Sequence, residues 1–122
     1  MTIDQMRNYC LAKKGVTEEL PFGDGFLVMK VLGKMFALIP LEVEIPRINL
    51  KVEPVEGLEL RANYESVQPA FHMNKKHWIT ATANGSIPEK ELHLWIDNSY
   101  NLVITKFTKA KKQELDNLQT VI

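Results

Sequence analysis

The sequence predicts a single α+β domain, residues 1–122, in which one antiparallel sheet carries the helices on one face. Three observations predict this class. Helix-start signals and 3.6-residue apolar periods occur at the beginning, middle and end of the chain. Short segments typical of strands lie between them, joined by turns too short for parallel crossovers. With 122 residues, 45% hydrophobic and 25% charged, the chain has the size and composition of one globular domain.

Four segments are expected to be helical. The first opens at the capping-box pattern Thr2-x-x-Gln5 and stops near Gly15. The second covers about residues 54–64 and starts with a proline, which the first turn of a helix tolerates. The third opens at Ser86-x-x-Glu89, and a short last helix is expected over residues 109–118. The third helix has a core-facing apolar side, made of Leu92, Trp95, Ile96, Ser99, Leu102, Val103 and Phe107.

Five segments are expected to be strands. Residues 26–31 and 34–40 form a hairpin through a two-residue turn. Residues 47–52 alternate between apolar and polar side chains, as half-buried strands do. Residues 67–73 and 77–83 form a second pair. The predicted order is therefore α-β-β-β-α-β-β-α, with a further short helix at the end, and hairpin connections imply an antiparallel sheet with helices on one face.

The charges balance in number but are unevenly distributed. Fifteen basic and fifteen acidic residues give a formal net charge of zero, which argues against tight, non-specific coating of DNA. No acid lies between Glu65 and Glu89 or from Asn98 to Gln113, and both stretches contain lysines. Such segregation can build a basic face on a neutral protein. The alternative is that these lysines are solvated on ordinary elements.

Several features favour the cytoplasm as the location. The single cysteine, Cys10, cannot form an internal disulfide, which suits a reducing compartment. No apolar run approaches the roughly 18 residues of a membrane span. The first residues include Asp4 and lack the basic and apolar regions of a signal peptide. No membrane partner is therefore expected.

Six motifs, spread in order over residues 7–103, resemble those of the MmcQ/YjbR family of small bacterial proteins. They are Arg7-Asn8-Tyr9-Cys10-Leu11, Pro21-Phe22-Gly23, the segment Lys30 to Leu38, Asn49-Leu50-Lys51, His72-Met73-Asn74-Lys75-Lys76-His77-Trp78, and the segment Ile96 to Val103. The chain departs from the family pattern at the acidic connection 41–46 and in the lysine-rich tail after Phe107.

The resemblance implies a fold and suggests a function. The family is similar to the secretion-chaperone-like α+β architecture, with the element order predicted above. The same fold resembles the double-wing DNA-binding domain of the phage transcription factor MotA. The resemblance therefore implies DNA binding as an expectation, although a shared fold does not fix a shared function.

The segment 72–78 is the first candidate site. It carries two lysines, an asparagine, two histidines and a tryptophan on one predicted hairpin: His72, Asn74, Lys75, Lys76, His77 and Trp78. Such side chains can hold a phosphate backbone, stack on a base and read base edges. The structural alternative is that Trp78 belongs to the core, His72 bonds within the fold and the lysines keep the hairpin tip soluble.

The polar side of the strand 47–52 is the second candidate site. Arg47, Asn49 and Lys51 lie on one face of it, and Lys30 is a candidate to continue the row. Two cations and an amide suit an anionic ligand. The alternative is structural, because the sheet face away from the helices is polar in any such fold.

The sequence favours neither a metal site nor an enzyme. His72 and His77 would need a third ligand such as His93 or Asp97, and their spacing matches no familiar metal motif. Cys10 lies in the apolar stripe of its helix, as buried and inert cysteines do. The glycines form no phosphate-binding motif, and no G-x-S-x-G elbow occurs. No cofactor is expected.

Two functions follow from these observations. The first is a DNA-binding module that lays its sheet and the 72–78 hairpin on double-stranded DNA, with modest and salt-dependent affinity. The second is a protein-interaction module, chaperone-like or dimerising. Its surface would be the exposed sheet face or the apolar helix flank around Trp95 and Phe107.

Overall fold

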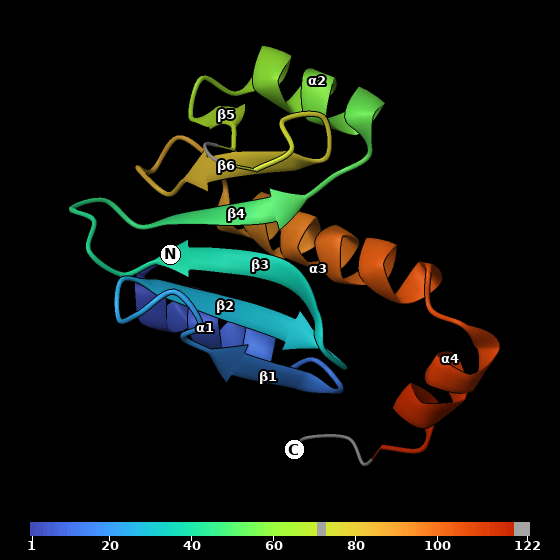
Figure 1. Ribbon diagram of the computed structural model, residues 1–122. Coiled ribbons are helices and arrows are strands. Elements are labelled where there is room, and N and C mark those ends of the chain that lie inside the picture. The colour runs from blue at the N-terminus through green and yellow to red at the C-terminus, as the bar shows by residue number, and fades with distance from the viewer. Residues whose placement is uncertain (71–72, 119–122) are drawn as a thin grey trace.

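The computed structural model describes residues 1–70 and 73–118, and within these ranges the chain forms four helices and six strands (Figure 1). In chain order they are α1 (Ile3–Leu11), β1 (Val16–Glu19), β2 (Phe26–Val31), β3 (Lys34–Pro40), β4 (Arg47–Lys51), α2 (Pro54–Asn63), β5 (Val67–Pro69), β6 (Trp78–Thr82), α3 (Glu89–Thr105) and α4 (Lys109–Asp116).

The six strands form one antiparallel sheet in the order β1-β2-β3-β4-β6-β5. In Figure 1, α1 and α3 lie behind the sheet, and α2 lies beside the β5 edge. The predicted α+β class and the order of the predicted elements are confirmed. The structure adds one strand ahead of them, β1, which pairs with β2 along the edge. Its sequence, Val-Thr-Glu-Glu, contains a single apolar residue, so no alternating apolar pattern marks it.

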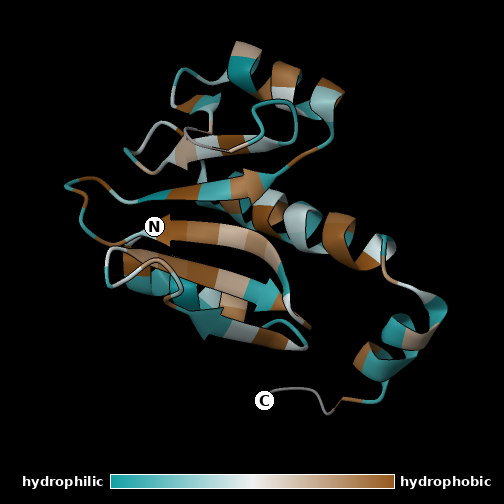
Figure 2. Cartoon of the chain, in the orientation of Figure 1, coloured by the Kyte–Doolittle hydropathy of each residue, from teal (hydrophilic) through white to brown (hydrophobic). Residues whose placement is uncertain are grey.

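The core lies between the sheet and the helices. Figure 2 shows hydrophobic residues concentrated along β2 and β3, whereas β1 and α4 are mainly hydrophilic. Side chains that alternate along the strands enter one cluster with the buried sides of α1 and α3. The largest fully buried side chains include Phe36, Met6, Met29, Ile39, Ile48, Leu50, Ile79, Leu92 and Ile96.

A β-bulge in β3 places Phe36 in this core. Met29 pairs with Ala37 and Lys30 pairs with Met35, so Phe36 is the extra residue between two regular pairs. A bulge turns two consecutive side chains toward the same face. Phe36 and Ala37 are accordingly both fully buried in the core cluster.

Ser99 of α3 bonds to backbone groups of β3 and β4 next to the bulge, where the pairing of these two strands ends. The pairing of β3 with β4 covers only Ala37 with Leu50 and Leu38 with Asn49. Beyond it, the Ser99 hydroxyl donates to the carbonyl oxygen of Phe36 at 2.5 Å and accepts from the amide of Lys51 at 2.8 Å. One fully buried hydroxyl therefore joins two central strands to the helix that crosses them.

Polar contacts also join α1 to α3. Asp97 accepts hydrogen bonds from the Tyr9 hydroxyl at 2.8 Å and from the Lys13 ammonium. The Tyr100 hydroxyl donates to the carbonyl oxygen of Lys14 at 2.6 Å. These contacts fix the first helix against the long helix on the covered side of the sheet.

The two predicted capping boxes have different outcomes. The one at Thr2 and Gln5 is confirmed, with both reciprocal hydrogen bonds present. The one at Ser86 and Glu89 is wrong. The hydroxyl of Ser86 bonds to Asn84 and contacts Ser66 instead, and α3 begins at Glu89 without a side-chain cap.

Gly57 explains how α2 forms despite a glycine in its interior. A Cβ atom at this position would lie 2.9 Å from Cγ2 of Val52. The missing side chain therefore allows α2 to approach the end of β4 closely, and this packing outweighs the low helix propensity of glycine.

The Ser99 contact gives the first prediction. Ser99→Ala leaves the carbonyl of Phe36 and the amide of Lys51 without their partner. Each orphaned buried group costs about 1–3 kcal/mol, so we expect the free energy of unfolding to fall by roughly 2–4 kcal/mol. Urea denaturation followed by circular dichroism measures the change.

The matched control is Ser86→Ala, which also removes a hydrogen-bonded serine hydroxyl but at an exposed position. We expect this variant to lose less than about 0.5 kcal/mol. Equal losses in the two variants would contradict the role given to Ser99.

Candidate functional site

The face of β4 and β6 that points away from the helices carries most of the predicted site residues. Arg47 pairs with Thr82, Asn49 with Thr80, and Lys51 with Trp78. Their neighbours along each strand, such as Ile48 and Ile79, belong to the core, so alternation directs these six side chains to the other face. Trp78 is half-buried there and lies outside the core cluster. We call this surface the outer face.

A hollow of about 490 Å³ lies on the outer face. Its lining combines a cation, amides, hydroxyls and an aromatic ring: Phe26, Pro40, Arg47, Asn49, Gln68, Pro69, Thr80 and Thr82. Arg47 and Gln68 are exposed, and Phe26 keeps 44% of its surface accessible. The hollow therefore offers donors, acceptors and an apolar contact at one place.

Asn49 organises this hollow. It is only 8% exposed. Its side-chain oxygen accepts a hydrogen bond from the Thr80 hydroxyl at 2.6 Å, and its amide nitrogen donates to the sulfur of Met73 at 3.4 Å. Asn49 thus holds Met73 against the sheet, and its side-chain amide is used within the fold.

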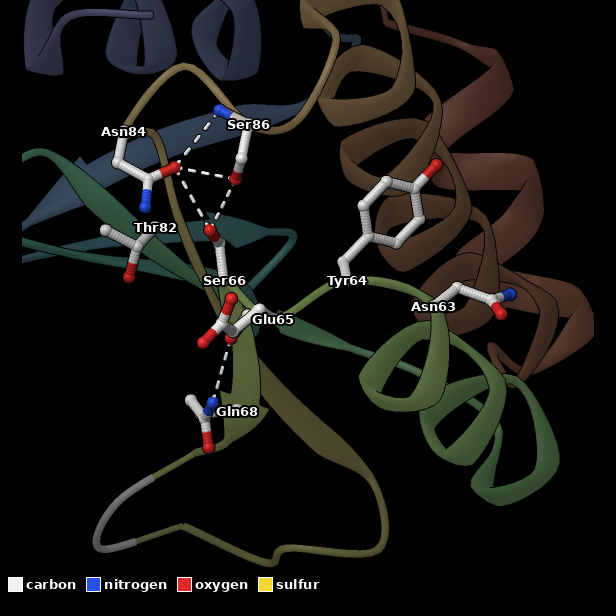
Figure 3. Close-up of a pocket in the computed structure, with 8 residues that line it drawn as sticks. All are labelled: Asn63, Tyr64, Glu65, Ser66, Gln68, Thr82, Asn84 and Ser86. Atoms are coloured by element: carbon white, nitrogen blue, oxygen red, sulfur yellow. Dashed lines mark hydrogen bonds between the residues drawn. The ribbon is translucent and has the colours of Figure 1, made fainter.

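A second hollow, of about 570 Å³, adjoins the first and is shown in Figure 3. The two share Gln68 and Thr82. The side-chain oxygen of Asn84 accepts hydrogen bonds from the hydroxyls of Ser66 and Ser86 at 3.0 and 2.7 Å. The remaining lining residues are Asn63, Tyr64 and Glu65. The hydrogen-bonded network of Ser66, Asn84 and Ser86 was not predicted, because Ser66 lies 18 residues from Asn84 in the sequence and only the Asn84-Gly85 turn was a visible signal.

The structure separates the cations that the sequence places in one row. Arg47 lines the outer-face hollow, whereas Lys51, at the other end of β4, lines a different hollow with Lys34 and Lys106. Lys30 forms an ion pair with Glu19 of β1, with 2.8 Å between nitrogen and oxygen. Lys30 therefore does not continue the row as a free cation.

The turn before β6 carries the other candidate residues. The side-chain oxygen of Asn74 accepts from the amide of Lys76 at 3.0 Å, and the Asn74 carbonyl accepts from the amide of His77 at 3.1 Å. Lys75 and Lys76 are exposed at this turn. The His77 carbonyl accepts from the amide of Val52 at 2.8 Å, which joins the turn to the end of β4.

One detail of this hairpin differs from the prediction. The strand β5 ends at Pro69, short of the predicted Met73, and the sulfur of Met73 accepts from the side-chain amide of Asn49. His72 lies outside the described residues.

The two aromatic residues that define the predicted protein-binding helix flank are buried. Trp95 is 3% exposed and packs edge-to-face on Tyr64, with 5.1 Å between ring centroids. Phe107 is 9% exposed. Both side chains belong to the core cluster, where α3 meets the sheet.

The two residues considered as further metal ligands have other roles. His93 stacks on Tyr9, with 4.0 Å between ring centroids, and Asp97 joins α1 to α3. In the described part of the chain, no three His, Cys, Asp or Glu side chains gather closely enough to hold a metal ion. Across residues 1–70 and 73–118, no helix is long and apolar enough to span a membrane.

The fold and the outer face define a small α+β protein whose sheet is covered by helices on one side and carries polar hollows on the other. The YjbR family model matches residues 11–102. The chain belongs to the YjbR family.

Known relatives extend this assignment over nearly the whole chain. The uncharacterised protein YjbR of Escherichia coli K12 is 30% identical over 118 residues, which cover 97% of this chain and all of the relative. The uncharacterised protein YbdF of Escherichia coli O157:H7 is 39% identical over 95 residues, 78% of each chain. The crystal structure of Deinococcus radiodurans protein DR2400 has a TM-score of 0.89 at 40% identity, covering 98% of this chain and 91% of that one.

Cys10 gives the second prediction. The thiol is fully buried, and burial raises its pKa to about 12. Because the thiolate is the reactive form, we expect almost no alkylation of the folded protein at pH 8. Alkylation should become complete once urea unfolds the chain. Mass spectrometry after iodoacetamide treatment measures both, and rapid labelling of the folded protein would contradict the core position.

Proposed function

We propose that this protein is a DNA-binding module of the cytoplasm, and that it binds through the outer face of its sheet. The observation that carries the proposal is the hollow lined by Arg47, Gln68, Thr80 and Thr82 on the face that α1 and α3 leave open. We propose a binding role without catalysis.

The side chains in the hollow suit nucleic acid. Arginine, threonine and glutamine are among the side chains that donate hydrogen bonds to phosphate oxygens and base edges. Phe26, at the same hollow, offers an exposed aromatic surface. Asn49 contributes by positioning Thr80 and Met73.

Basic side chains lie at both ends of the outer face. Arg47 pairs with Thr82 at one end of β6, and the turn with Lys75 and Lys76 precedes Trp78 at the other. At about 3.3 Å per strand residue, the two ends are roughly 15–20 Å apart. The same length of duplex axis carries about five nucleotide steps of each strand, so phosphates of one duplex can reach both ends.

The charge balance limits the strength of this binding. The net charge is zero, and the acidic residues Glu42 and Glu44 lie in the loop next to Arg47. With few phosphate contacts, the affinity should be modest and should fall steeply as salt increases.

The third prediction tests the outer face. Arg47→Gln/Lys76→Gln removes one cation from each end. Because each phosphate contact contributes about 0.9 to the slope of log K against log salt, we expect the slope to decrease by about 1.8. Fluorescence anisotropy of a labelled duplex, titrated between about 50 and about 200 mM salt, measures it.

The matched control is Lys90→Gln/Lys112→Gln, which removes two exposed lysines from α3 and α4. We expect its salt slope to equal that of the unmodified protein. Equal slopes for both double variants, or no binding at the lowest salt, would refute DNA binding through the outer face.

A second candidate function, protein interaction, is favoured by the outward side of α2. Val55 and Leu58 are one helical turn apart there and are 68% and 60% exposed. Exposed apolar side chains in adjacent positions are typical of contact surfaces. A complex or homodimer formed through them would be insensitive to salt and weakened by Val55→Ser/Leu58→Ser, which separates this candidate from DNA binding.

A further inference from the structure

A third hollow, of about 320 Å³, lies where β3 begins and where β4 and α3 end. Three lysines from three different elements line it: Lys34 from the start of β3, Lys51 from the end of β4, and Lys106 just after α3. The other lining residues are Met35, Val103 and Phe107. Among the described residues, no acid lines this hollow.

The three lysines differ from the cations that are neutralised by a nearby acid. Arg7 is paired with Glu18, Lys13 with Asp97 and Lys30 with Glu19. Within residues 1–70 and 73–118, by contrast, the lysines at this hollow make no ion pair. Like charges gathered around one hollow repel each other, and a bound anion removes that repulsion.

A structural role explains the position of only one of the three lysines. Lys106 caps the C-terminal end of α3, where a cation stabilises the exposed carbonyl groups of the last turn. This effect does not require Lys34, which follows the β2–β3 turn, or Lys51, which ends a strand of the sheet. Their convergence on the same hollow needs a different explanation.

The size of the hollow and its apolar lining residues limit the class of ligand that it can bind. Its volume lies at the lower end of the roughly 300–1,000 Å³ of small-molecule sites. Met35, Val103 and Phe107 supply an apolar wall. The Lys111 ammonium lies 4.9 Å from the centre of the Phe107 ring and adds a further positive charge behind that wall.

We propose that this hollow binds a small phosphorylated organic molecule, with its phosphate groups between Lys34, Lys51 and Lys106 and its ring or chain against the apolar wall. Lysine is a common phosphate ligand because its ammonium group acts as a mobile point charge. The hollow shares no lining residue with the outer-face hollow, and its test does not depend on DNA binding.

The test compares two double variants, each lacking two cations. Lys34→Gln/Lys106→Gln alters the lysine hollow and leaves the backbone contact of Lys51 with Ser99 intact. Arg47→Gln/Lys76→Gln alters the outer face only. Binding of ADP, of pyrophosphate and of adenosine is measured by isothermal titration calorimetry at low salt, and the amide signals of Val103 and Phe107 are followed by NMR.

We expect ADP to bind the unmodified protein and to shift the signals of Val103 and Phe107. Lys34→Gln/Lys106→Gln should weaken ADP binding roughly 30-fold, since each charge contact screened as in bulk water corresponds to about a fivefold change. Arg47→Gln/Lys76→Gln should bind ADP unchanged, and pyrophosphate should bind more weakly than ADP. Absence of ADP binding, equal weakening in both variants, or adenosine binding as tightly as ADP would overturn the proposal.

Discussion

The hydrogen bonds of Ser99 join α3 to β3 and β4 where the pairing of these two strands is shortest. The bulge at Phe36 fills the core with an aromatic ring, and the pairing of β3 with β4 ends at the neighbouring residue, Ala37. A single hydroxyl group bonds to both strands there, and it comes from the helix that covers this part of the sheet. The position of α3, the burial of Phe36 and the alignment of β4 therefore depend on one another. A substitution at Ser99 should therefore alter all three of these features.

The outer face is a consequence of that arrangement. With β4 fixed, Ile48 and Leu50 face the helices, so Arg47 and Asn49 must face away from them. The hollows on this side are polar without being strongly charged, which is unusual for a surface that coats DNA and better suited to a weak or selective contact. Family membership agrees with this fold, while the named relatives carry no assigned activity that would choose among ligands.

Much of the fold could be predicted from local sequence signals. The Leu32-Gly33 turn sets the β2–β3 hairpin, since both residues have positive φ angles, and the apolar stripe of α3 is buried as predicted. The site was harder to predict. Alternation correctly grouped Arg47 with Lys51, but only the three-dimensional structure shows that they line separate hollows at opposite ends of β4. Likewise, Ser86 has the sequence of a helix cap, and only tertiary contacts reveal that its hydroxyl is used elsewhere.

The most direct measurement is an NMR titration of the isotopically labelled protein with a short DNA duplex. The proposed binding predicts that amide signals on the outer face, at Arg47, Gln68, Thr80 and Thr82, shift together as duplex is added and return when salt is raised. Signals from the covered helix α1 should stay unchanged. Shifts confined to the outward side of α2, or no shifts at low salt, would contradict DNA binding through the sheet.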